Sequence, residues 1–282
     1  GVDHVYVAPT FSLPEEESAL TSDGELQPMT SNATTMIGAD QLNATGFTGK
    51  GMKVAILDTG IVVDHPNFGA LSEDKLTESS LTKEGVDAIW NTLNAGQMTS
   101  LRNRSYYNSK LPFIFNYYTR DFDVSHATAQ HDHGTHVAGI AAANRYVPHY
   151  DADGDLYYDK QELGVTGVAP DAQLVVMKVF GVGGGAYSSD YMAAIEDAIW
   201  LNCDSVNLSL GSGSAGRSYG SKSDQQILDS FRNTDTVVTV SAGNNGAWGE
   251  NVLTGTGMTY TTDVRMHTGG SPGSYTNSFT IA

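Results

Sequence analysis

Residues 53–60 read Lys-Val-Ala-Ile-Leu-Asp-Thr-Gly, a short apolar run that ends in an aspartate and a Thr-Gly turn. A continuous apolar run of this length, closed by a turn, is typical of a strand buried on both faces of a parallel sheet. Asp58 stands at the carboxyl end of that predicted strand. Active sites of open α/β sheets lie beyond the carboxyl ends of the strands, so Asp58 is a candidate site residue.

The same pattern recurs along the chain. Further apolar runs, each closed by a glycine-rich turn, occupy residues 173–180, 205–210 and 236–240. Helical patterns occupy residues 135–144 and 189–201 between them. Strands that alternate with helices predict βαβ units. We therefore expect an α/β fold, with a doubly wound, mostly parallel sheet and helices on both faces.

The amino-acid composition limits the kinds of molecule that this protein can bind. The chain has 282 residues, of which 40% are hydrophobic, and a formal net charge of −17 at pH 7. This length favours one large domain over two small ones. An acidic protein is repelled by phosphate, which argues against nucleic acid or an anionic membrane as a partner.

No apolar run approaches the roughly 20 residues that span a bilayer, so we expect no transmembrane segment. Cys203 is the single cysteine, which excludes an internal disulfide and predicts an inert core thiol.

A second informative segment, His133-Gly-Thr-His-Val-Ala-Gly139, opens the helical pattern after residue 132. A buried carboxylate beside a histidine can fix the imidazole tautomer and stabilise its cation, which makes the histidine a competent general base. Each residue alone also fits a structural role, Asp58 in a turn before Gly60 and His133 as a helix cap. Taken together, the two segments favour a catalytic pair.

These segments resemble the subtilases, a family of serine proteases. Four motifs of that family have counterparts here in the same order, and they span roughly residues 50–250. A finer resemblance, to lactocepin-like cell-envelope proteinases, rests on residues 110–118 and 167–180. The four motifs are the aspartate motif at Val54–Ile61, the histidine motif at His133–Gly139, the substrate-strand motif at Val206–Gly211 and the oxyanion motif at Val240–Asn244.

The resemblance implies a subtilisin-like fold and a role for each matching residue. Asp58 would orient His133, His133 would act as general base and acid, and the side chain of Asn244 would donate to the oxyanion. A peptide or protein substrate would add a strand by backbone hydrogen bonds, beside glycines that permit a close approach. No cofactor is implied for catalysis, and a secreted or cell-surface location is expected. The implied substrate-binding residues are Gly183, Gly184, Gly185, Ser209, Leu210 and Gly211.

The nucleophilic serine is missing from the chain. In subtilases it lies in a Gly-Thr-Ser-Met-Ala-x-Pro segment after the asparagine motif, and residues 245–282 contain no such segment. We expect that serine in the C-terminal remainder of the same enzyme, which would leave the sheet incomplete at its C-terminal end and this chain alone inactive. The segment Gly216-Arg-Ser-Tyr-Gly220 fits a Gly-x-Ser-x-Gly elbow, but there the acid and histidine follow the serine, whereas here they precede it. The alternative is a pseudoprotease or peptide-binding scaffold without a nucleophile.

Two further patterns suggest metal ions. Acidic residues at alternate positions resemble a calcium loop, although Leu156 stands where such a loop carries glycine, and a solvated acidic insertion is the alternative. His131, His133 and His136 could form a metal cluster in a metal-dependent hydrolase, but no glutamate base lies in that segment. The candidate ligands of a structural Ca²⁺ are Asp151, Asp153, Asp155 and Asp159.

The domain organisation follows from these segments. Residues 30–282 are predicted to form the N-terminal part of a subtilisin-like catalytic domain, with insertions at about 72–118 and 146–163. The first insertion is predicted to contain a helix over residues 81–93 and a Tyr/Asn-rich connector. Residues 1–29 are expected to be an N-terminal extension or a propeptide remnant; the second alternative rests on the resemblance of Gly1–Phe11 to the last strand of a subtilase propeptide.

Overall fold

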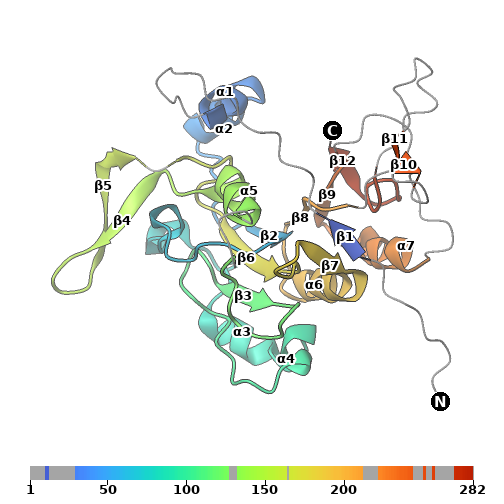
Figure 1. Cartoon of the computed structure of the whole chain (residues 1–282). Coiled ribbons are helices and arrows are strands. Elements are labelled where there is room, and N and C mark those ends of the chain that lie inside the picture. Colours follow the sequence, from blue (N-terminus) through green and yellow to red (C-terminus); the bar gives the residue numbers. More distant parts are fainter. Residues whose placement is uncertain are drawn as a thin grey trace.

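A parallel sheet forms the centre of the computed structural model (Figure 1). The strand order is β12-β9-β8-β2-β6-β3, and every neighbouring pair is parallel. The structure describes residues 10–12, 29–126, 132–163, 165–211, 222–243, 250–251, 256–257 and 270–281. The sheet strands are β2 (Lys53–Asp58), β3 (Phe113–Asn116), β6 (Gln173–Lys178), β8 (Ser205–Leu208), β9 (Val237–Ser241) and β12 (Phe279–Ile281).

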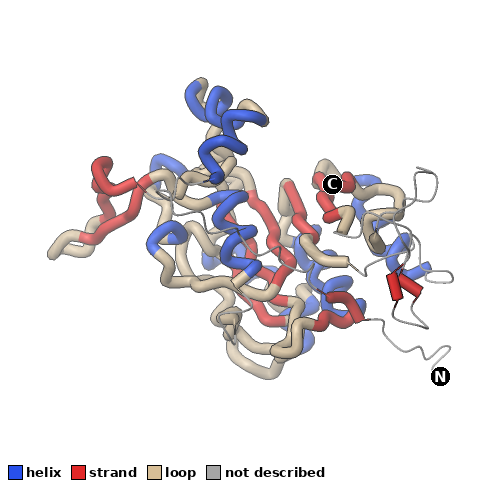
Figure 2. The backbone as a smooth tube through the Cα atoms, turned by 45° about the horizontal axis from the view of Figure 1, so that its top comes forward, coloured by secondary structure: helices blue, strands red, loops and turns tan. Residues whose placement is uncertain are grey.

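Helices and short strand pairs surround this sheet (Figure 2). The helices are α1 (Met29–Met36), α2 (Ala39–Ala44), α3 (Lys83–Ile89), α4 (Asn94–Met98), α5 (His133–Ala142), α6 (Ser188–Trp200) and α7 (Lys222–Asp229), with 3₁₀ turns at Pro66–Phe68, Glu73–Lys75 and Ser230–Asn233. The remaining strands form antiparallel pairs: β1 (Thr10–Ser12) with β7 (Gly185–Tyr187), β4 (Tyr146–Tyr150) with β5 (Leu156–Leu163), and β10 (Glu250–Asn251) with β11 (Thr256–Gly257).

Helices cover both faces of the sheet. Alternate residues of β2 belong to different apolar cores, because side chains of a strand point to opposite faces. Ala55 and Leu57 share one core with Ile195 of α6, whereas Ile56 shares the other with Ala138 of α5. The predicted doubly wound α/β fold is therefore confirmed. No helix among the described residues is long and apolar enough to cross a membrane.

The predicted insertions differ in kind. Residues 146–163 form the β4–β5 hairpin, which projects from the body of the molecule in Figures 1 and 2. The range 72–118 holds α3 and α4 but ends in β3, a strand of the main sheet. The sequence predicted a connector at β3, yet Phe113, Ile114 and Phe115 are buried and pair along β6. An edge strand of four residues has too short a pattern to be separated from a loop by periodicity.

A buried lysine supports the turn that leads into β6. The side-chain nitrogen Nζ of Lys110 donates to the carbonyl oxygens of Pro170, at 2.8 Å, and Ala172, at 2.7 Å. Burial lowers the pKa of Lys110 to about 7, although the negative charge of Asp171 opposes that shift. The two carbonyls match the two donors of a neutral amine.

This burial predicts a pH dependence of stability. Between the folded pKa of about 7 and the ordinary value of 10.5, the unfolded chain binds more protons at Lys110 than the folded chain. The free energy of unfolding should therefore rise with pH in that window, by up to about 1.4 kcal/mol per pH unit. Lys110→Met should abolish this rise, and Lys50→Met, at an exposed lysine, should keep it. Urea unfolding from about pH 7.5 to pH 9.5 measures the difference; equal slopes for wild type and Lys110→Met would contradict the expectation.

Candidate active site

The carboxylate that ends β2 meets the imidazole that opens α5. Nδ1 of His133 lies 2.8 Å from Oδ1 and 3.0 Å from Oδ2 of Asp58. Asp58 is 1% exposed, and the side chain of His133 is 19% exposed. A charged carboxylate only accepts hydrogen bonds, so Nδ1 donates to it and the acceptor lone pair of the neutral ring lies on Nε2. The structure thus brings together the two residues that the sequence paired.

Hydrogen bonds from backbone N–H groups to side-chain oxygens hold the strand end and the helix start together. The N–H of Thr59 donates to Oδ1 of Asp58 at 2.7 Å, and the N–H of Gly134 donates to Oγ1 of Thr59 at 2.9 Å. The N–H of Val62 donates to Oγ1 of Thr135 at 3.0 Å. The first N–H groups of a helix have no partner within it, so Thr59 also satisfies one of the open donors of α5.

Two glycines allow close packing around the strand end, Gly60 against Val124 and Gly134 between α5 and β2. A Cβ at Gly60, where φ is +103°, would lie 2.0 Å from the carbonyl oxygen of Val124. A Cβ at Gly134 would lie 2.2 Å from the carbonyl oxygen of Gly60 and 3.1 Å from Oδ1 of Asp58. Both distances to backbone oxygens are too short for any side chain. The glycines that follow Asp58 and His133 in the sequence therefore have a steric reason.

The predicted substrate-binding residues lie on loops that leave neighbouring strands. Gly183 and Gly184 lie in the turn after β6, and Gly185 begins β7. Ser209, Leu210 and Gly211 follow β8. Both loops leave the carboxyl ends of their strands, and β6 and β8 flank β2 in the sheet, so they share the edge at which Asp58 lies.

An extended segment of the chain already pairs with one of these loops. β1 runs antiparallel to β7, with Thr10 opposite Tyr187, Phe11 opposite Ala186 and Ser12 opposite Gly185. The sequence did not predict this pairing, because backbone pairing over such a separation leaves no local pattern. That Gly1–Phe11 is a propeptide remnant stays a prediction.

Several predicted residues lie outside the described residues. These are Asn244, His131 and the segment Gly216–Gly220. The oxyanion role of Asn244 and the alternative metal cluster therefore stay predictions. His136 is exposed on α5, one turn beyond His133.

Sequence analysis did not single out Lys178, which is a neighbour of the Asp58–His133 pair. Lys178, the last residue of β6, pairs in register with Asp58. Its Cδ would lie 3.0 Å from a Cβ at Gly60, and its Nζ donates to the carbonyl oxygen of Ser125. Burial lowers the pKa of Lys178, against the charge of Asp123. The sequence signal that could have found Lys178 is its position at the end of an apolar strand.

Comparison with known proteins decides the family. The sequence model of the subtilase family matches residues 49–282, most of the chain. The chain belongs to the subtilase family. This subtilase is similar to the PI-type proteinase of Lactococcus lactis subsp. cremoris, with 34% identity over 206 residues, which cover 72% of this chain and 10% of that protein.

Two further relatives support the assignment. The PIII-type proteinase of Lactococcus lactis subsp. cremoris strain SK11 is 32% identical over 239 residues, 84% of this chain and 11% of that protein. The minor extracellular protease Vpr of Bacillus subtilis strain 168 is 28% identical over 236 residues, 82% of this chain and 22% of that protein. The subtilase chain thus spans about a tenth of the length of the two lactococcal proteinases.

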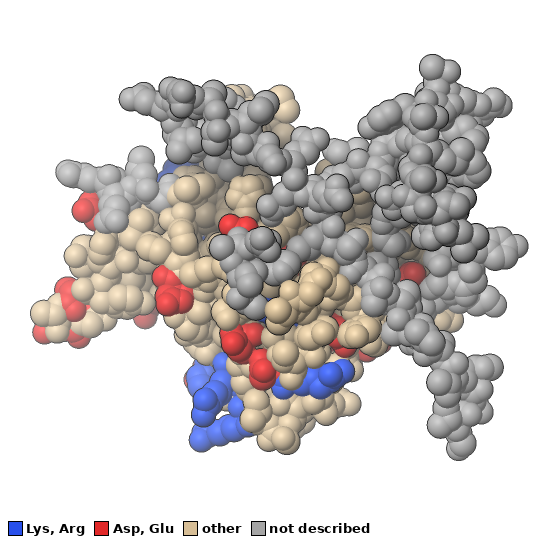
Figure 3. Space-filling view, in the orientation of Figure 1, with Lys and Arg blue, Asp and Glu red and all other residues tan. Residues whose placement is uncertain are grey.

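The acidic segment that resembles a calcium loop lies on the β4–β5 hairpin, where Figure 3 shows acidic side chains at its projecting end. Oδ1 of Asp151 accepts from the N–H groups of Asp153, at 3.0 Å, and Asp155, at 2.8 Å, as in a tight turn. Asp159 lies further along, in β5. No three His, Cys, Asp or Glu side chains within the described residues gather as metal ligands. Calcium binding at this hairpin stays a prediction from the sequence.

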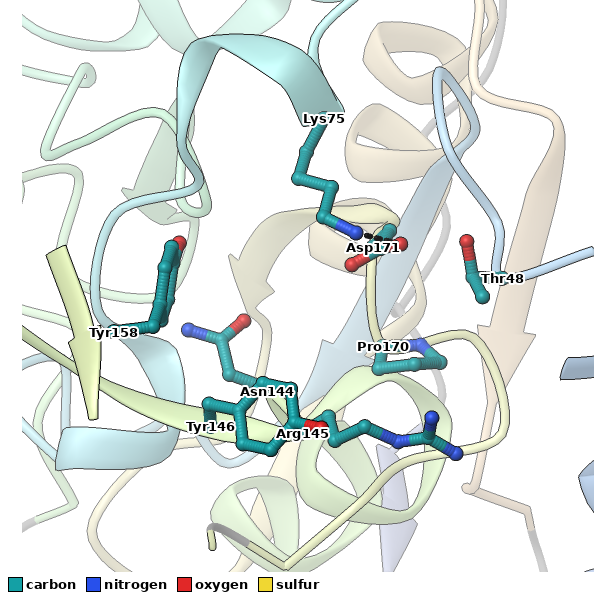
Figure 4. A pocket seen from close by; sticks show the side chains of 8 residues that line it. All are labelled: Thr48, Lys75, Asn144, Arg145, Tyr146, Tyr158, Pro170 and Asp171. Carbon is teal, nitrogen blue, oxygen red and sulfur yellow. Dashed lines mark hydrogen bonds and ion pairs between the residues drawn. The ribbon is translucent and has the colours of Figure 1, made fainter. Parts of the chain in front are cut away.

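A separate cavity of about 130 Å³ lies near the other end of α5 (Figure 4). Nζ of Lys75 and Oδ2 of Asp171 form an ion pair of 3.0 Å in its wall. None of the predicted active-site residues lines this cavity. The lining residues are Thr48, Lys75, Asn144, Arg145, Tyr146, Tyr158, Pro170 and Asp171.

The contact between α5 and the end of β2 can be tested at Gly134. Gly134→Ala should lower the free energy of unfolding by about 1–3 kcal/mol, because the new methyl group meets the carbonyl oxygen of Gly60 and the Asp58 carboxylate. Gly139→Ala is the matched control on the same helix, since nothing lies within 4 Å of its Cβ position. It should be neutral or stabilising by up to about 1 kcal/mol. Equal unfolding midpoints for the two variants in denaturant would contradict this account.

Proposed function

We propose that this chain is the N-terminal part of the catalytic domain of a secreted or cell-surface serine endopeptidase that cleaves extended peptide segments. The observation that carries the proposal is the 2.8 Å contact between the buried carboxylate of Asp58 and Nδ1 of His133. Membership of the subtilase family supports serine protease chemistry at this pair. The extracellular location of one relative, stated in its name, supports secretion.

Each residue has a defined part in the proposed reaction. Asp58 holds the Nδ1–H tautomer of His133 and stabilises the imidazolium that forms. His133 takes the proton of the serine hydroxyl and then delivers it to the leaving amine. The amide of Asn244 donates a hydrogen bond to the oxyanion, an interaction that is stronger in the transition state than in the ground state.

The nucleophile is proposed to come from the C-terminal remainder of the same enzyme. Residues 245–282 contain no Gly-Thr-Ser-Met-Ala-x-Pro segment, and the lactococcal relatives are about ten times longer than the part matched here. This chain alone is therefore expected to be inert.

Peptide binding is proposed at the edge of β7 and beside the loop after β8. The pairing of β1 with Gly185–Tyr187 supports this, because it is the antiparallel backbone pairing that an extended substrate would make. Ser209, Leu210 and Gly211 would lie on the other side of the substrate, where glycine again permits a close backbone approach.

A pseudoprotease or peptide-binding scaffold remains the alternative, favoured by the missing serine motif. A fluorophosphonate probe separates the two functions, because it reacts only with an activated serine. In the complete protein, the probe should label a serine outside residues 1–282. Absence of any labelled serine, with peptide binding intact, would establish the scaffold instead.

The catalytic pair predicts a steep loss of activity on mutation in the complete enzyme. His133→Ala should lower kcat on a peptide anilide by about 10⁶-fold, the loss caused by removal of the histidine in subtilisin, a relative of this chain. Asp58→Asn should lower kcat by about 10⁴-fold, because the amide imposes the wrong tautomer. His136→Ala is the control, since His136 is an exposed histidine on the same helix. A kcat for His133→Ala within tenfold of the control would refute the proposal.

A further inference from the structure

Lys178 is a buried lysine next to the Asp58–His133 pair, and the proposed reaction gives it no part. It ends β6, is 8% exposed and pairs in register with Asp58 at the end of β2. Val176 and Ile56, two residues earlier in these strands, belong to the core that includes α5. Side chains two residues apart on a strand share a face, so Lys178 and Asp58 both lie on the face that α5 covers.

The side chain of Lys178 joins the turn after β2 to the loop that precedes α5 in the chain. Its Cδ would lie 3.0 Å from a Cβ at Gly60, so its methylene chain packs against that glycine. Its Nζ donates to the carbonyl oxygen of Ser125. In the same loop, the carbonyl oxygen of Val124 accepts from the N–H of Ile61 at 2.8 Å. Two adjacent residues of the loop therefore hold the turn, one directly and one through Lys178.

Acidic side chains of the same loop act on Lys178. Burial lowers the pKa of Lys178, and the negative charges of Asp123 and Asp121 act against that shift. The carboxylate of Asp123 accepts from the N–H of Ser125 at 3.0 Å, so it is held beside the residue whose carbonyl oxygen binds Nζ. The titratable groups on the elements around Lys178 are Asp58 of β2, Asp121, Asp123 and His126 of the loop, and Asp132, His133 and His136 at the start of α5.

We propose that Lys178 is a positioning residue of the catalytic pair, which clamps the turn after Asp58 and places a positive charge beside the pair. This inference rests on the proposed function. The clamp fixes the strand end that carries the carboxylate of Asp58. A nearby positive charge disfavours the imidazolium, so His133 stays a neutral base down to a lower pH. A side chain that only filled space would not have the second effect.

The test measures the pH midpoint at which His133 loses its proton in the complete protein. Diethyl pyrocarbonate reacts with the neutral imidazole, and mass spectrometry reads the rate at His133 separately from the other histidines. Lys178→Met removes the charge and leaves Asp121 and Asp123 uncompensated, and both changes favour the imidazolium. The midpoint should rise by about half a pH unit, the shift caused by a unit charge roughly 10 Å away at an effective dielectric constant of about 45. Lys178→Arg keeps the charge and the methylene chain, so it should keep the wild-type midpoint.

Lys53→Met is the matched control for loss of a buried lysine. Lys53 begins β2, is 2% exposed, and its Nζ donates to the carbonyl oxygen of Ser79 at 3.0 Å. It lies at the other end of the strand from Asp58, roughly 17 Å away at the usual rise per residue, which is about two Debye lengths at physiological salt. Its loss should lower stability without moving the midpoint of His133. Equal shifts in Lys53→Met and Lys178→Met would overturn the inference.

A second variant tests the same charges from the loop side. Asp123 is exposed, and Asp123→Asn keeps an oxygen that can accept from Ser125, so this variant should fold. It removes a negative charge beside Lys178 and should therefore lower the midpoint of His133, opposite to Lys178→Met, by about 0.2 pH unit because exposed charges are screened. A structural defect has no reason to act in opposite directions. A midpoint at or above the wild-type value would overturn the inference, whether or not Lys178→Met folds.

Activity tests the clamp. With a peptide anilide, at a pH where His133 is neutral in every variant, Lys178→Met should lower kcat about three- to tenfold at unchanged KM, because a misplaced pair slows the reaction. A more basic imidazole alone would raise kcat slightly, so the fall reports the lost clamp. Lys178→Arg should restore kcat, and a wild-type kcat in Lys178→Met would refute the clamp.

The histidine modification separates this inference from the proposed function, because it needs no nucleophilic serine. Shifted midpoints in a protein that hydrolyses nothing would support the charge of Lys178 beside the pair, and only the proposed function would fail. A midpoint of Lys178→Met equal to that of the wild type would overturn the inference even in an active protease.

Discussion

The N-terminus of α5 can lie against the end of β2 only because Gly134 lacks a side chain. A methyl group at Gly134 would lie 2.2 Å from the carbonyl oxygen of Gly60, and a methyl group at Gly60 would lie 2.0 Å from the carbonyl oxygen of Val124. This contact brings the imidazole of His133 onto the carboxylate of Asp58. The candidate site therefore depends on backbone packing first and on side-chain chemistry second.

Sequence patterns predicted the elements whose environment is uniform along their length. Strands β2 and β6 are buried on both faces, so their apolar runs are continuous, and α5 and α6 each bury one helical face. The predicted helix over residues 81–93 was less accurate, because α3 ends at Ile89 and Leu93 is already extended before α4. The apolar residues of this range lie on α3 and on the segment that leads into α4. A single periodic pattern does not show the break between two such elements.

The residues in and around the candidate site also divide into those that the sequence predicted and those that only the structure shows. Asp58 and His133 were found because each ends or begins an element at a turn that a motif marks. The stack of Tyr118 on Tyr187, 69 residues away in the chain, was not found, since such a contact appears only once the chain has folded. Lys110 was hidden for the same reason, because only the fold shows that its side-chain nitrogen donates to two backbone carbonyls. Contacts between distant segments leave no periodicity to detect.

The contact between Asp58 and His133 helps to decide between the two candidate functions, a peptide-binding scaffold and a protease. Burying a charged pair costs stability, and apolar side chains of similar volume in place of both partners are often neutral or stabilising. Asp58 is almost fully buried, and the contacts described for its carboxylate are the N–H of Thr59 and the ring of His133. Binding an extended peptide at β7 needs neither group, because backbone pairing supplies that interaction. A buried acid whose partner is a partly exposed imidazole is costly for a scaffold and is what a general base requires, so this contact favours the endopeptidase.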